Sequence, residues 1–136
     1  MTPRRPSTRV ITPGEVAVRA ATARQYLQVG ELVIGEDPAE RQVAGGLAVL
    51  AAIAASDAIC GTALGEYARG KDHDLAPDLL KTIRPDGPDL ARHLGRVLEH
   101  KPTAHYGTTY LTAETVASML HHAGALVVAM ERIRRR

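Results

Sequence analysis

Apolar residues recur at every third or fourth position along most of the chain, which is the spacing of amphipathic helices. No run of residues alternates convincingly between apolar and polar with a period of two, so the pattern favours helices over strands. Most of the periodic segments follow a helix-start signal, and glycine or proline punctuates their ends. These signals predict five helices, at about residues 13–34, 38–69, 74–84, 88–106 and 113–133.

Particular residues mark the expected ends of these helices. Thr12 and Glu15 have the spacing of a capping box, and Thr112 is the predicted N-cap of the last helix. Gly70 is the expected residue that follows the second helix. Pro102 falls inside the fourth helix and must kink or interrupt it, because proline lacks the N–H that the helix needs.

The second predicted helix is apolar almost all the way round, which places it in the middle of a bundle. Short connections join the helices, so that neighbours run antiparallel. We therefore expect an all-α fold, namely an antiparallel up-and-down helical bundle of four long helices plus one short helix, the third. The predicted bundle spans residues 12–133, between a disordered basic tail at 1–11 and a basic C-terminal end at 134–136.

The composition narrows the class of protein. The chain has 136 residues, of which 45% are apolar, and this is enough for one domain with its own core. It has four Tyr and neither Phe nor Trp, which argues against the aromatic-rich RRM and OB-type nucleic-acid domains. The single cysteine, Cys60, indicates a reducing compartment. Without a signal peptide pattern or a membrane span, we expect a cytoplasmic protein with no membrane partner.

The charge is divided unevenly along the chain. Seven arginines and one glutamate near the two ends give those ends a net charge of +6, so that a total of +2 leaves the body with about −4. Such a body has no strong electrostatic footprint for duplex DNA. The basic ends are interpreted as solvated tails, with a nucleic-acid arm as the alternative.

The sequence favours neither a metal site nor a cofactor. None of the six histidines stands three or four residues from another, which is the spacing of helical metal ligands. His121 and His122 lie off the apolar stripe and are interpreted as solvated surface. Phosphate loops and hydrolase motifs are absent from the sequence. Cys60 lies in an apolar helix and is interpreted as a packing residue.

Polar residues that invite a chemical role fall in one helix and two short stretches. Asp57 lies in the middle of the apolar second helix, where a carboxylate is costly unless it is exposed, hydrogen-bonded or paired. Its candidate roles are to line a cleft or to bond a tyrosine hydroxyl. The stretch 67–74 brings cations, carboxylates and an imidazole together, and helix capping is its alternative interpretation. The stretch 92–107 gathers basic side chains near the end of the fourth helix, where they also suit the helix dipole. The candidates in the two stretches are Arg69, Asp72, His73, Arg96, His100, Lys101, His105 and Tyr106.

Three motifs follow one another in order along the chain. They are Ser56-Asp57-Ala58-Ile59-Cys60, then Arg69-Gly70-Lys71-Asp72-His73, and then Leu90-Ala91-Arg92-His93-Leu94 followed by Lys101 and Ala104-His105-Tyr106-Gly107. In this order they resemble the HEPN superfamily of small helical proteins over about residues 14–133, most closely an actinobacterial-type branch. The resemblance implies a HEPN-like bundle that forms a homodimer through the faces carrying these polar residues. Many HEPN proteins are metal-independent ribonucleases of toxin–antitoxin or phage-defence systems.

The chain departs from the ribonuclease motif of that superfamily, in which a histidine follows an arginine after four to six residues. Here three residues separate Arg96 from His100, and eight separate Arg96 from His105. Lys101 and Tyr106 have the four-residue gap, but lysine lacks the bidentate fork of arginine, and tyrosine is a poor base at neutral pH.

Three functions follow as hypotheses. The leading one is a non-catalytic, dimeric HEPN-like protein that binds RNA or a nucleotide, or assists a partner protein encoded nearby. Its ligand-binding candidates are Arg96, Lys101, Tyr106, Asp57, Arg69, Asp72 and His73. The alternative is a metal-independent ribonuclease in which His105 and His100 act as acid and base, with Lys101 or Arg96 on the phosphate. The third is a plain helical adaptor that functions through its apolar dimer face.

Overall fold

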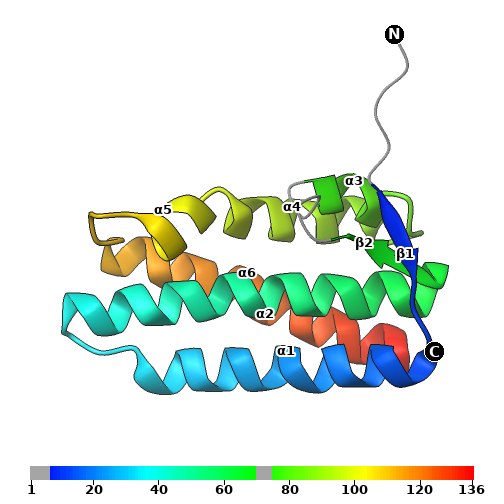
Figure 1. The fold of residues 1–136 in the computed structure, drawn as a ribbon, viewed down its shortest axis with the longest axis horizontal. Coiled ribbons are helices and arrows are strands. Elements are labelled where there is room, and N and C mark those ends of the chain that lie inside the picture. The colour runs from blue at the N-terminus through cyan, green and yellow to red at the C-terminus, as the bar shows by residue number, and fades with distance from the viewer. Residues whose placement is uncertain (1–6, 70–74) are drawn as a thin grey trace, which may run out of the picture.

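The computed structural model describes residues 7–69 and 75–136 (Figure 1). Helices dominate it, and its only strands within the described ranges are two short ones that pair with each other. The all-α prediction is therefore confirmed. In chain order the elements are β1 (Thr8–Val10), α1 (Pro13–Val33), α2 (Pro38–Leu64), β2 (Glu66–Ala68), α3 (Ala76–Leu80), α4 (Gly87–Leu98), α5 (Lys101–Tyr106) and α6 (Ala113–Arg134).

The long helices run alternately up and down, as predicted (Figure 1). The helices α1 and α2 form an antiparallel hairpin, and α6 packs against both of them. Near the connection between α1 and α2, Gly30 of α1 lies close to Leu47 of α2 and Leu120 of α6. The helix α4 packs along α6 in the opposite direction, and α5 continues that line back over the start of α2.

Side-chain hydrogen bonds cap the starts of three helices, and they confirm the predicted caps at Thr12 and Thr112. The Thr12 hydroxyl accepts from the Glu15 N–H at 3.2 Å, and Glu15 Oε1 accepts from the Thr12 N–H at 2.9 Å, which completes the capping box. Thr112 accepts from the Thr115 N–H at 3.1 Å at the start of α6. Asp37 accepts from the Ala39 N–H at 2.7 Å at the start of α2. These side chains satisfy N–H groups that a helix leaves unpaired at its first turn.

The central position of α2 follows from its small residues. Side chains that carry no more than a methyl group let the neighbouring helices approach closely, and larger side chains from α4 and α6 then fill the space around it. Most of the apolar surface of α2 is buried, so this helix is the core of the bundle even though its length and hydropathy alone would allow it to cross a membrane. The fully buried small residues of α2 are Ala44, Ala48, Ala51, Ala52, Ala54, Ala55 and Ala58.

The second helix is shorter than predicted. It ends at Leu64 rather than near Arg69, because Gly65 adopts the left-handed conformation with φ 73° and its N–H closes the last turn on the Gly61 carbonyl. The chain then enters β2, which pairs antiparallel with β1. Part of the segment assigned to a disordered tail therefore belongs to the fold, and Ile11 is buried in the core.

The fourth predicted helix is divided into α4 and α5. The break falls at Glu99 and His100, and Pro102 lies in the first turn of α5, where its missing N–H costs nothing. The third helix is also shorter than predicted, since α3 begins at Ala76. The expected start at Asp72 or Asp74 lies outside the described residues.

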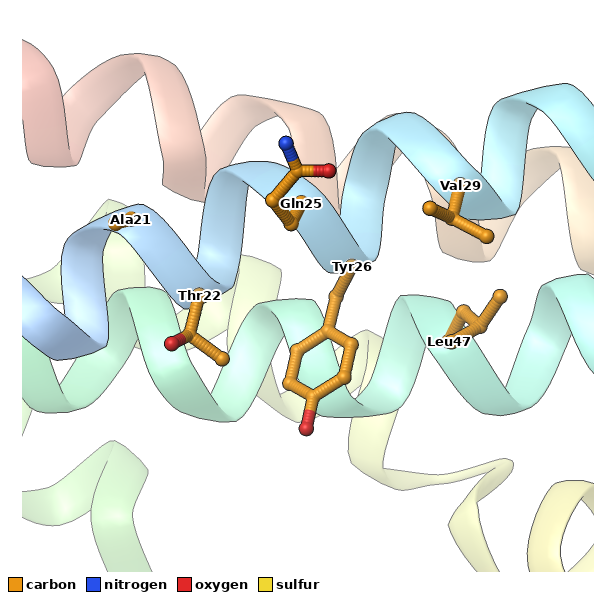
Figure 2. A pocket seen from close by; sticks show the side chains of 6 residues that line it. All are labelled: Ala21, Thr22, Gln25, Tyr26, Val29 and Leu47. Carbon is orange, nitrogen blue, oxygen red and sulfur yellow. The ribbon is translucent and has the colours of Figure 1, made fainter.

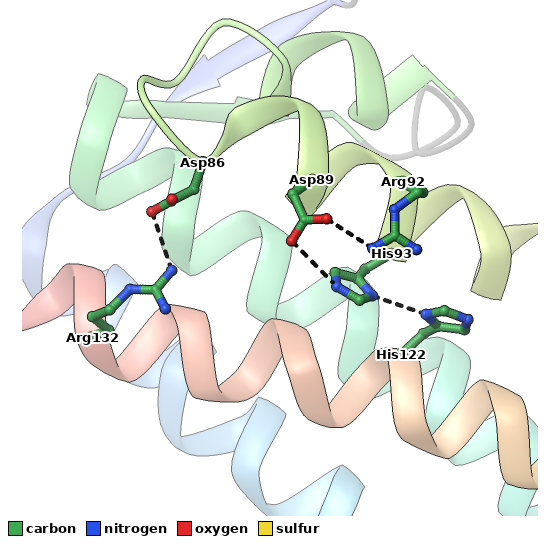
Figure 3. A network of polar contacts seen from close by, with 6 residues as sticks. All are labelled: Asp86, Asp89, Arg92, His93, His122 and Arg132. Atoms are coloured by element: carbon green, nitrogen blue, oxygen red, sulfur yellow. Dashed lines mark hydrogen bonds and ion pairs between the residues drawn. The ribbon is translucent and has the colours of Figure 1, made fainter.

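The basic C-terminal end contacts the start of α4. Arg132 and Arg136 both donate to Oδ2 of Asp86, at 3.1 and 3.0 Å (Figure 3 shows the Arg132 contact). The interpretation of this end as a solvated tail is therefore wrong for these two arginines. Asp86 directly precedes α4, makes no side-chain cap bond there and pairs with these two arginines instead.

Candidate functional site

Gln42 of α2 binds the segment that contains α5. Gln42 donates to the Thr103 carbonyl at 2.7 Å and accepts from the Leu111 N–H at 2.9 Å. The amide therefore binds the backbone on both sides of residues 104–110. Because Gln42 lies on the core helix, this short segment has a fixed place at the end of the bundle.

Exposed aromatic side chains project from this braced segment. Tyr106 is 79% exposed and Tyr110 is 62% exposed. The ring of His105 lies 6.0 Å from the Tyr106 ring, and His105 Nε2 is 3.2 Å from the Gly46 carbonyl oxygen of α2. We call His105, Tyr106 and Tyr110 together the α5 surface, and Lys101 leaves another face of α5 because it lies five residues before Tyr106.

The two catalytic candidates are not brought together. His100 is half-buried at the N-cap of α5, whereas His105 is exposed in its last turn. Five residues along a helix correspond to a rotation of roughly 140°, so the two imidazoles leave different faces. Arg96 lies on α4 and its one ion pair within the described residues is with Glu99, at 4.0 Å. A shared acid–base site formed by these residues of one chain is therefore not present in the geometry.

Asp57 is paired and also lines a cavity. Its carboxylate is 3% exposed, and Arg19 of α1 donates to Oδ2 through Nε at 3.2 Å and through a terminal nitrogen at 2.9 Å. A cavity of about 420 Å³ beside this pair is lined by Ile11, Glu15, Val18 and Tyr67 as well as by the pair itself. Burial raises the pKa of Asp57 to about 6, and the Arg19 charge opposes that rise. The prediction that Asp57 is either paired or lining a cleft is met in both respects.

The predicted site residues therefore fall into two groups. Gly46, beside His105, and Asp57 are eleven positions apart on α2, which is about 16 Å along the helix axis. Arg69 follows β2 near the Asp57 end, where its side chain is exposed and its N–H donates to the Ser7 carbonyl. Asp72 and His73 lie outside the described residues.

One polar cluster was missed in the sequence. His93 of α4 and His122 of α6 approach with their Nδ1 atoms 2.8 Å apart, and Asp89 Oδ2 lies 3.5 Å from His93 Nε2 (Figure 3). Burial is the main cause that lowers the pKa of both histidines. The interpretation of His122 as solvated surface is therefore wrong, although His121 is exposed as expected. The contact joins residues 29 positions apart, so helical spacing gave no sign of it.

Two further predictions concern reactive groups. Cys60 is 2% exposed, and burial together with the charge of Asp57 raises the pKa of its thiol to about 12, so it packs in the core as expected. Within residues 7–69 and 75–136, no group of three or more His, Cys, Asp and Glu side chains is arranged to hold a metal ion.

Comparison with family models, curated proteins and solved structures finds no match for this chain. Membership of the HEPN superfamily stays a prediction.

Proposed function

We propose that this protein binds single-stranded RNA, or the nucleotides that compose it, on the α5 surface without cleaving it. The observation that carries the proposal is the exposure of Tyr106 and Tyr110 on a segment that Gln42 holds in place. Half of the four tyrosines of the chain lie on this one short segment. An exposed, rigidly placed aromatic ring is a stacking platform that accepts any base.

The neighbouring side chains suit the rest of a nucleotide. His105 adds a ring beside Tyr106, and Lys101, at the start of α5 on another face, adds a positive charge that a longer RNA strand reaches with a phosphate. This basic and aromatic combination compensates locally for a body whose net charge is negative. We therefore expect binding that depends on bases as well as on phosphates, and that weakens moderately rather than steeply with added salt.

The absence of cleavage is proposed because the acid–base pair is not assembled within one chain. Cleavage through the RNA 2′-OH needs one group to take a proton and another to return one, with a cation on the phosphate. His100 and His105 lie on different faces, and His105 Nε2 is engaged by the Gly46 carbonyl. Arg96 is paired with Glu99 on α4. These contacts support binding over catalysis.

Replacing either tyrosine of the α5 surface is expected to weaken RNA binding about tenfold, because stacking of one base on an aromatic ring contributes roughly 1–3 kcal/mol. The measurement is fluorescence anisotropy of a short labelled single-stranded RNA with wild type, Tyr106→Ala and Tyr110→Ala. Val128→Ala is the matched control, since it removes another exposed side chain from a different face, on α6. Equal affinities of all four proteins would contradict the proposed surface.

We propose further that the protein is a homodimer joined through the α1–α2 hairpin, and not through the faces that carry the polar motifs as the HEPN resemblance implies. An open apolar cavity of about 500 Å³ lies on this face, where Val29 of α1 and Leu47 of α2 lie side by side (Figure 2). One turn closer to the α1–α2 connection, Leu32 is 74% exposed and Val43 is 55% exposed. Exposed apolar side chains gathered on one face in this way are typical of a protein–protein interface. A second copy fits it, because each protomer would bring the same apolar face to a two-fold contact.

The Leu32→Glu variant is expected to be monomeric where wild type is dimeric, because the new charge would be buried without a partner in the interface. Size-exclusion chromatography with light scattering measures the mass of each. Val128→Glu is the control, because it adds the same charge at an exposed apolar position of α6. A monomeric wild type, or a dimer that Leu32→Glu leaves intact, would rule out this interface.

A further inference from the structure

The cavity beside Asp57 has the features of a built binding site that is separate from the α5 surface. Elements distant in sequence form its walls, with Ile11 preceding α1, Val18 and Arg19 on α1, Asp57 on α2 and Tyr67 on β2. Its volume of about 420 Å³ lies within the range of pockets that take small organic molecules. The β1–β2 pairing that sequence analysis did not predict is what brings Tyr67 to this wall.

The carboxylate of Asp57 keeps one oxygen available to a ligand. Both bonds from Arg19 go to Oδ2, and Oδ1 accepts no hydrogen bond from any described residue. Asp57 lines the cavity, and Arg19 leaves this second oxygen of its carboxylate untaken. An anionic oxygen in an apolar setting attracts a hydrogen-bond donor strongly, because water competes little there.

The charges of the lining select the kind of donor. Glu15 and Asp57 contribute two carboxylates, and Arg19 contributes one cation, so the lining carries a net negative charge. The pKa of Glu15 is lowered by its bonds to Thr12, which keeps that group ionised. The remaining wall is the Tyr67 ring with two aliphatic side chains, Ile11 and Val18. A cation with an apolar body complements both parts of this lining.

We propose that this cavity binds a small organic cation, namely a primary ammonium group on an apolar or aromatic body. The ammonium donates to Oδ1 of Asp57, and the body lies between Tyr67 and Val18. Arg19 holds the other carboxylate oxygen and so fixes the orientation of Asp57. The site takes a free small molecule and does not depend on RNA binding at the α5 surface, which lies toward the other end of α2.

Binding at this site is coupled to the proton on Asp57. The titratable groups around Asp57 are Arg19 and Glu15 from α1, Tyr67 and Glu66 from β2 and Cys60 on the same helix, and the charge of Arg9 on β1 acts on Glu15. A proton on the carboxyl group removes the charge that the ammonium needs. Because the pKa of Asp57 is about 6, the affinity for an amine is expected to fall as the pH drops below that value, approaching tenfold for each further pH unit.

Isothermal titration calorimetry with benzylamine and n-butylamine tests the proposal, with benzyl alcohol as the neutral counterpart of benzylamine. At pH 7.5 an amine is expected to bind at least tenfold more tightly than benzyl alcohol. Asp57→Asn is expected to remove that preference, whereas Glu99→Gln, which changes an exposed carboxylate on the far end of α4, leaves it unchanged. Wild-type protein at pH 5 provides an independent readout and is expected to bind the amine about tenfold more weakly than at pH 7.5.

The outcomes that would overturn the proposal are equally definite. They are no binding of either amine, equal affinities for benzylamine and benzyl alcohol, or an affinity for the amine that is constant between pH 5 and 7.5. The pH series needs no variant, so it decides the matter even where Asp57→Asn does not fold. Loss of RNA binding by the α5 surface variants bears on the other site alone, which keeps the two proposals distinguishable.

Discussion

The Gly87→Ala variant is expected to have a free energy of unfolding about 3 kcal/mol lower than that of wild type, toward the upper end of the cost of overpacking. Gly87 is the first residue of α4. Its N–H donates to the carbonyl of Ile83, in the connection that follows α3, at 2.7 Å. A methyl group at this position would lie 2.4 Å from the Leu80 carbonyl oxygen and 2.9 Å from that of Lys81. Both are backbone atoms, so relief requires α3 and α4 to separate. Urea denaturation followed by circular dichroism measures the change.

The Gly95→Ala variant is the matched control for this prediction. Gly95 lies in the same helix, and nothing within 4 Å would meet an added methyl group there. Alanine is the better helix former, so we expect this variant to be more stable than wild type by roughly 0.5–1 kcal/mol. Equal effects of the two substitutions would show that the close approach of α3 to Gly87 does not constrain the fold.

Ionisation of Asp57 is expected to make the native protein less stable as the pH rises from about 4 to 6. In the unfolded chain an aspartate titrates near its ordinary value of about 3.9, whereas burial raises the native pKa of Asp57 to about 6. Between these values the native state holds a proton that the unfolded state has released, so the free energy of unfolding falls with rising pH. The stabilising contribution of this proton is thus complete at pH values below the pKa of Asp57 in the unfolded chain, and it is lost above the pKa of Asp57 in the native state. The shift corresponds to roughly 3 kcal/mol.

Urea denaturation at closely spaced pH values, compared between wild type and Asp57→Asn, isolates this contribution. Other carboxylates affect both proteins alike, so the difference between the two curves should change by a few kcal/mol across this window. Asp78→Asn serves as the control, because Asp78 is exposed and pairs loosely with Lys81 at 3.8 Å. A constant difference between wild type and Asp57→Asn would mean that Asp57 titrates normally.

Local signals made the helix starts predictable. Thr12, Asp37 and Thr112 each bond an N–H group two or three residues ahead, so both partners appear within a few positions of the sequence. The burial of α2 was predictable for a similar reason, because its apolar residues surround the helix. The interruption at Pro102 also follows from that residue alone.

Long-range contacts account for what the sequence did not reveal. Residues 66–69 are compatible with continuing α2, and it is the pairing of β2 with β1, more than fifty residues earlier, that gives them an extended conformation. Neither strand exceeds three residues, so neither carries a readable alternation. Gly70 was the predicted residue after the helix, and the helix ends earlier, at Gly65, where this pairing begins.

In the candidate site too, the sequence indicated single residues but not the long-range contacts that they make. The sequence marked Asp57 as a costly carboxylate, but its partner Arg19 lies 38 positions away on another helix. Tyr106 was singled out, whereas Tyr110 and the supporting Gln42 were not, because their importance depends on how the connection after α5 folds back on α2. His93 and His122 meet only because α4 packs along α6.

Incubation of the purified protein with a pool of structured and single-stranded RNA in EDTA, alongside His105→Ala, tests the central claim most directly. The account predicts that the protein retains single-stranded RNA on a filter and that this RNA is recovered at full length from both proteins. Metal-independent cleavage that disappears in the folded His105→Ala variant, with cyclic phosphate at the product ends, would contradict it and make the protein a ribonuclease. Failure of wild type to retain any RNA would contradict it as well.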